Sequence, residues 1–221
     1  MDEIDSRLKS SPNFIHLDLS LNTDRTGISM VCVSGVKDVT DMDGKVTALP
    51  NLIHIFSVAL QAPRGSNIAY DKVMSFIVWL RRQGFNIAGI SRDQFQSEYL
   101  GQLLASKGFK ESKISLDRTP DGYLALRSVL TEQRIDLLHV ELLENELTHL
   151  QRDAMTGRVD HTSSSSKDCS DSLAGAVWNA VQQNPGVTVH AKTVASIIAA
   201  VNKSKTTNPM SLSPFMYTKV K

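Results

Sequence analysis

The chain has 221 residues, enough for one large domain, or one domain with a small appendage, and for a substantial core. Its 24 basic and 23 acidic residues leave a net charge of +1, so the composition has no global nucleic-acid signature, and any such surface must be a local patch.

Cys32 and Cys169 lie far apart in the sequence and suit neither a disulfide framework nor a zinc site, which favours a reducing cytosol. The polar N-terminal stretch does not have the pattern of a signal peptide, and no apolar run is long enough to span a bilayer. We therefore expect a soluble, intracellular protein that is not secreted.

The first half of the chain predicts a small sheet. Residues 1–12 resemble a leader or the remnant of a linker. Apolar, β-branched stretches separated by polar turns then predict three strands in an antiparallel meander: 14–19, 28–36 and 45–60. A helix over 66–82 and a strand over 85–90 follow, which predicts a crossover that places the new strand parallel to an earlier one.

The second half predicts mainly helices. In chain order, the expected elements are a helix over 97–107, a strand over 112–116, helices over 120–133 and 140–151, a loop over 156–161, and a late helix rich in small residues that begins near 167. We expect one α/β domain over 13–183, and then a C-terminal segment, 184–221, with a helix over 191–202 and an irregular end.

Three acidic residues mark the elements of this domain. Asp18 lies in the first strand, Asp93 at the end of the strand after the first helix, and Asp171 in the first turn of the late helix. If the fourth strand lies parallel to the first and next to it, the three carboxylates meet at one end of the sheet. Clustered carboxylates repel one another unless cations lie among them, and oxygen ligands favour Mg²⁺ or Mn²⁺.

This order of elements and acids resembles that of the ribonuclease H-like nucleases, and in more detail the nuclease domain of the large terminase subunit that packages viral DNA. The resemblance covers about 14–181 and rests on these stretches: 16–20 (HLDLS), 24–27 (DRTG), 91–97 (SRDQFQS), 142–147 (LLENEL), 159–161 (VDH) and 167–175 (KDCSDSLAG). It implies a mixed sheet, with an antiparallel three-strand meander plus parallel strands, flanked by helices on both faces.

The resemblance also implies a function. The protein would be a divalent-metal-dependent endonuclease. It would cut concatemeric double-stranded DNA with little sequence specificity, in the cytoplasm of an infected host cell. Asp18, Asp93 and Asp171 would be its catalytic residues and metal ligands. Asp168, one helical turn before Asp171, is either a fourth ligand or the N-cap of the late helix. The implied partners are an ATPase domain, a small terminase subunit and a capsid portal. No Gly-x-x-x-x-Gly-Lys-[Ser/Thr] loop for ATP occurs in the sequence.

The expected mechanism is hydrolysis of a phosphodiester with two Mg²⁺ or Mn²⁺ ions, one generating the nucleophile from water and the other stabilising the leaving 3′ oxygen. Asp18 is the best candidate to bridge both ions. Lys167 adjoins the acids and is a candidate contact to DNA phosphate, as are Arg92 and His161.

Other functions and other roles stay open. A junction resolvase of the same fold would need a dimer and a four-way substrate, and a docking module for DNA or the portal would need no catalysis. Asp24 reads as a turn residue, and Trp178 reads as core. Glu141, Glu144 and Glu146 read as a solvated helix face.

Overall fold

The structure is a computed structural model that describes residues 6–19, 25–62, 68–93, 98–153, 155–162 and 165–183. The described strands are β1 (Asn13–Asp18), β2 (Thr26–Thr40), β3 (Val46–Leu60), β4 (Ile87–Arg92), β5 (Glu111–Lys113), β6 (Ile135–Asp136), β7 (Leu150–Arg152) and β8 (Val159–His161). The described helices are α1 (Ser6–Ser10), α2 (Tyr70–Arg82), α3 (Glu98–Ser106), α4 (Asp121–Thr131), α5 (Glu141–Thr148) and α6 (Asp168–Gln183).

Six strands form one mixed sheet in the order β5-β4-β1-β2-β3-β6. β1, β2 and β3 pair antiparallel, whereas β4 lies parallel to β1, β5 parallel to β4 and β6 parallel to β3. The sequence prediction of an antiparallel meander plus parallel strands, with β4 beside β1, is confirmed.

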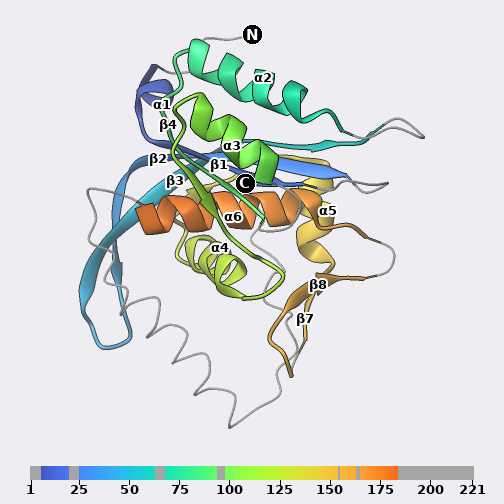
Figure 1. The fold of residues 1–221 in the computed structure, drawn as a ribbon. Coiled ribbons are helices and arrows are strands. Elements are labelled where there is room, and N and C mark those ends of the chain that lie inside the picture. Colours follow the sequence, from blue (N-terminus) through green and yellow to red (C-terminus); the bar gives the residue numbers. More distant parts are fainter. Residues whose placement is uncertain are drawn as a thin grey trace.

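Helices cover both faces of this sheet, as expected (Figure 1). Successive side chains of a strand point to opposite faces, and β1 divides its side chains between two cores in this way. Phe14 packs in the core with α4 and α6, whereas Ile15 and Leu17 pack in the core with α2 and α3. Across the described part of the chain, every helix falls short of the length and apolarity that crossing a bilayer requires.

Four local predictions differ from the structure. Residues 6–10 form α1, and this segment contacts the domain: the side-chain amide of Asn13 donates to the Leu8 carbonyl at 3.0 Å. β6 was expected to lead into a helix, but it pairs with β3. The helix predicted over 140–151 ends at Thr148. The loop predicted over 156–161 contains β8, which pairs with β7 in a separate two-stranded hairpin. The helix predicted over 191–202 lies outside the described residues.

Candidate active site

Strand alternation brings Asp18 and Asp93 to the α6 face of the sheet. In β1, Phe14 and His16 face α6, since Phe14 packs in its core and the His16 ring touches Gly175; Asp18 follows two residues later. In β4, the Ser91 hydroxyl lies 2.8 Å from His16 Nδ1, and Asp93 follows two residues after it. The Asp93 amide donates to the Leu17 carbonyl at 3.3 Å, so both aspartates end neighbouring parallel strands.

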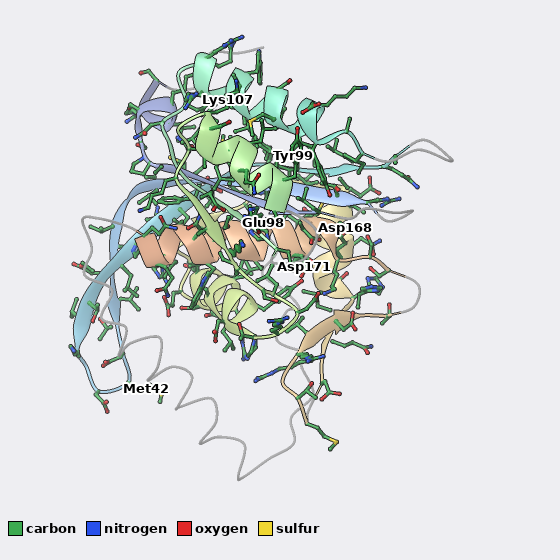
Figure 2. The ribbon with its side chains drawn as sticks, viewed as in Figure 1. Met42, Glu98, Tyr99, Lys107, Asp168 and Asp171 are labelled. Carbon is green, nitrogen blue, oxygen red and sulfur yellow. The ribbon has the colours of Figure 1, made fainter. Side chains whose placement is uncertain are left out.

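The first turn of α6 lies against the same end of the sheet. Gly27 pairs with Asp18 across β1 and β2. A Cβ atom added to Gly27 would lie 1.9 Å from the carbonyl oxygen of Asp168, so only a glycine leaves room for the helix here. The small residues of α6 allow this close approach, and the charges of Asp168 and Asp171, at the start of the helix (Figure 2), act on Asp18.

Asp171 is held through both carboxylate oxygens. Tyr123 of α4 donates its hydroxyl to Oδ1 at 2.5 Å, and Lys167 Nζ lies 3.0 Å from Oδ2. Lys167 also donates to Oδ1 of Asp117 at 2.6 Å. Asp171 is 5% exposed, so these two partners fix the direction of a buried carboxylate.

The carboxylates interact electrostatically. Burial, followed by the negative charges of Asp171, Asp168 and Asp93, raises the pKa of Asp18 well above its ordinary value, and the positive charge of Lys167 offsets this only in part. Burial raises the pKa of Asp171 to about 6, although Lys167 and the Tyr123 hydrogen bond oppose the rise. Burial and the charge of Glu146 raise the pKa of Asp168.

This donor set suits a hard divalent cation, because it consists of carboxylate oxygens whose mutual repulsion a cation would relieve. Within the described ranges, however, no three Asp, Glu, His or Cys side chains already have the arrangement of a metal site. The structure thus brings Asp18, Asp93, Asp168 and Asp171 together without a preassembled coordination shell.

Glu146 belongs to this site, although its sequence pattern suggested a solvated face. It is 1% exposed, and its Oε2 accepts the backbone N–H of Ser170 in the first turn of α6 at 2.8 Å. Oε1 accepts the Ser166 hydroxyl at 2.6 Å. Glu146 therefore caps an N–H that an N-cap side chain would otherwise satisfy. One signal in the sequence pointed to it: Glu146 shares the face of its helix with Leu143, which is also buried.

The three candidate DNA contacts differ in position. Lys167 lies inside the cluster, where burial alone would lower its pKa, but the charges of Asp171 and Asp117 and hydrogen bonds to both raise it. His161 ends β8 with its ring one-third exposed. Arg92 points to the other face of the sheet, where its buried guanidinium pairs with Glu111 at 3.1 Å. That burial does not support a DNA contact, and Arg92 is better described as structural. Asp24 lies outside the described residues.

Cys32 and Cys169 are both buried, and neither forms a disulfide. Trp178, expected in the core, is partly buried and packs against the core that contains α4 and α6.

Comparison with known proteins places this arrangement among solved folds. No protein-family model matches the sequence, and a search of curated proteins gives no match. The large terminase nuclease of thermophilic phage G20c is 12% identical with a TM-score of 0.55, over 75% of this chain and 81% of that one. The large terminase nuclease domain of Thermus phage P74-26 is also 12% identical with a TM-score of 0.55, over 80% and 84%.

The large terminase of bacteriophage HK97 is 14% identical with a TM-score of 0.50, over 76% of this chain and 39% of that one. At such low sequence identities, these TM-scores show a shared fold. The chain therefore has the ribonuclease H-like mixed-sheet fold of the nuclease domains of phage large terminases, as its sequence resemblance predicted.

Proposed function

We propose that this chain is the metal-dependent endonuclease domain of a viral DNA-packaging terminase large subunit, which cuts concatemeric double-stranded DNA with little sequence specificity. The observation that carries the proposal is the convergence of Asp18, Asp93, Asp168 and Asp171, where burial and the charges of the other three carboxylates raise the pKa of Asp18. Asp171 is buried and the other three are partly buried. Gathering these carboxylates is costly without a cation, and a strongly perturbed group in such a cluster is typical of an active site. The shared fold is consistent with this function.

Each carboxylate has a distinct position in the proposed site. Asp18 is central, since it feels the charges of the other three, and it is our candidate to bridge two ions. Asp93 and Asp171 complete the set from β4 and α6. Asp168 is a candidate fourth ligand, because Glu146 already caps the N–H of Ser170. Bound Mg²⁺ or Mn²⁺ would supply a nucleophile from water and stabilise the leaving 3′ oxygen.

Two neighbours orient Asp171 for this role. The Tyr123 hydroxyl and Lys167 Nζ approach different oxygens of the carboxylate, so they fix its plane as well as its position. Lys167 is 19% exposed and can also meet a DNA phosphate at the edge of the cluster. Groups that orient ligands in this way commonly affect metal affinity or activity by about 10- to 100-fold.

The proposed setting follows from the proposed identity. Double-stranded DNA is the substrate, and an ATPase domain, a small terminase subunit and a capsid portal are the partners, in the cytoplasm of the infected host. His161 is retained as a candidate DNA contact because it ends β8, seven residues before the start of α6.

Cleavage of supercoiled plasmid with Mn²⁺, Mg²⁺ or EDTA tests the proposal. We expect cleavage with a metal, none in EDTA, and none by Asp18→Ala or Asp171→Ala proteins whose folding is verified by circular dichroism. Asp71→Asn, at an exposed position on α2, is the control and should cleave like the wild type.

Three results would contradict the proposal in different ways. Intact plasmid with both metals would favour a docking module. Full activity in both alanine variants would show that the carboxylate cluster is not the active site. A strong preference for four-way junctions over linear duplex would favour a resolvase.

A further inference from the structure

A pocket adjoins the carboxylate cluster on the side of the β7–β8 hairpin. Tyr123 and Arg127 of α4 form one wall, and Leu150, Arg152 and Val159 of the hairpin form the other. Among the described residues that line it, two are arginines and none is acidic. The surface inside this small pocket is mainly apolar, and the two arginines are the charged residues among those that line it.

Tyr123 connects this pocket to the proposed active site. Its ring lines the pocket, while its hydroxyl donates to Asp171 at 2.5 Å. Arg127 follows four residues later on the same face of α4, about 6 Å further along the helix axis.

The hairpin presents its basic face to α4. Arg152 pairs with Val159 and Leu150 pairs with His161, so these four side chains share one face of the hairpin. Asp160 pairs with Gln151 between them and belongs to the opposite face. Strand alternation thus places His161 on the face of Arg152, whereas Asp160 shares the face of Gln151, which also lines the pocket.

The Arg127 guanidinium is available for a ligand. It is half-buried, and within the described part of the chain it makes no hydrogen bond or ion pair, whereas the buried Arg92 and Arg134 both pair with glutamates. Among the described residues, the Arg152 side chain makes one hydrogen bond, from Nε to the Gly157 carbonyl at 3.3 Å. Its two terminal nitrogens can therefore donate to a ligand. A guanidinium without a carboxylate partner is well suited to phosphate, which it can bind through two parallel hydrogen bonds.

We propose that Arg127 and Arg152 bind backbone phosphates of the DNA strand that leaves the carboxylate cluster, so that the α4–hairpin pocket sets the path of the substrate. This inference rests on the proposed nuclease function and adds to it the surface that holds the DNA. It differs from the sequence expectation, which placed a DNA contact at Arg92.

The test is DNA binding measured apart from cleavage. A fluorescein-labelled duplex is titrated with Asp18→Asn protein, and with the same protein carrying Arg127→Gln or Arg152→Gln, at several salt concentrations. Each substitution should weaken binding and lower the slope of log affinity against log salt by about 0.9, the value for one lost phosphate contact. Arg127→Lys keeps the charge and should retain the slope. Arg82→Gln, exposed on α2 and outside the pocket, should leave both affinity and slope unchanged.

The inference is overturned if the two glutamine variants, shown to be folded, bind with unchanged affinity and salt slope, or if Arg82→Gln weakens binding as much. Plasmid cleavage by the wild type distinguishes this failure from failure of the proposed function. If the wild type cleaves DNA while Arg127→Gln and Arg152→Gln bind normally, the nuclease stands and the DNA path lies elsewhere. If the wild type neither binds nor cleaves DNA, both are overturned.

Discussion

The Tyr123 hydroxyl donates a 2.5 Å hydrogen bond to Oδ1 of Asp171, linking α4 to the first turn of α6. Both groups are buried, and burial together with the charge of Asp171 raises the pKa of Tyr123, which keeps the phenol protonated as a donor. A tyrosine on one helix therefore sets the direction of a candidate metal ligand on another.

Replacing Tyr123 with phenylalanine should impair metal use. The Asp171 carboxylate loses a hydrogen bond of the charged kind, worth about 1.5–3 kcal/mol, so the free energy of unfolding should fall by about that amount. Cleavage should need more Mn²⁺ and slow by about 10- to 100-fold. The measurement is plasmid cleavage as a function of Mn²⁺ concentration. Tyr99→Phe, exposed on α3, is the control (Figure 2); equal effects of the two substitutions would contradict the role of Tyr123.

Gly27→Ala should displace the first turn of α6. The new methyl group would lie 1.9 Å from the Asp168 carbonyl oxygen, and backbone atoms cannot move aside as a flexible side chain can. We expect a loss of about 1–3 kcal/mol in the free energy of unfolding, typical of overpacking, together with reduced cleavage. Denaturant unfolding and plasmid cleavage measure the two effects.

Gly89→Ala is the matched control for this substitution. Its methyl group would lie 3.2–3.3 Å from side-chain atoms of Phe14, Asn179 and Gln183, a milder contact at the other end of α6. It should cost less stability and spare activity. A larger loss from Gly89→Ala than from Gly27→Ala would refute the explanation.

Glu146→Ala should loosen the start of α6. The substitution removes the acceptor of the Ser170 N–H, a loss comparable to that of an N-cap, about 0.5–2 kcal/mol, and also frees Ser166. Glu141→Ala changes an exposed glutamate of the same helix and should have little effect. Thermal unfolding compares the two variants; indistinguishable melting temperatures would argue against the cap.

His54 should make the fold sensitive to acid. Burial lowers its pKa, although a hydrogen bond involving the Phe56 backbone opposes this, and Nε2 lies 2.8 Å from the Ser57 hydroxyl. The His54 imidazole therefore binds a proton more readily in the unfolded chain than in the native protein. This contribution to stability is therefore complete above the unfolded pKa of about 6.5 and is lost as the pH falls toward the folded pKa.

The pH dependence of unfolding tests this role. The slope from His54 can reach about 1.4 kcal/mol per pH unit within that window. His54→Gln should reduce the loss of stability on acidification, whereas His139→Gln, at an exposed position, should not. An unchanged profile in His54→Gln would exclude His54 as the cause.

The sequence predicted the sheet well because its long strands have clear signals. The strands from Phe14 and Ile28 have apolar runs bounded by a polar turn, and the change to helical period after residue 68 marks the crossover to β4. The parallel pairing of β1 and β4, which brings Asp18 and Asp93 together, followed from that crossover. The short strands β6, β7 and β8 were missed, because two or three residues are too few to show a period of two.

Tertiary packing supplies site residues that the sequence interpretation missed. Tyr123 lies in an ordinary amphipathic helix, and only the packing of α4 on α6 brings its hydroxyl to Asp171. Glu146 looked like its exposed neighbours, and Arg92 looked like a DNA contact because it adjoins Asp93. Its side chain faces α3 instead, since neighbouring residues of a strand point to opposite faces.

Asp18→Asn tests the central claim most directly. We propose that the negative charge of Asp18 destabilises the fold in the absence of metal and also binds the metal ions. Its raised pKa means that the ionised Asp18 lowers stability at neutral pH, so the variant, measured in EDTA, should melt at a higher temperature than the wild type. Mn²⁺ should stabilise the wild type, by about 2.7 kcal/mol at 100 times its dissociation constant, and the variant much less. The variant should cleave plasmid more than about 100-fold more slowly, since even groups that only orient ligands cost about 10- to 100-fold. A variant that melts lower in EDTA, gains as much from Mn²⁺ and still cleaves would contradict the account.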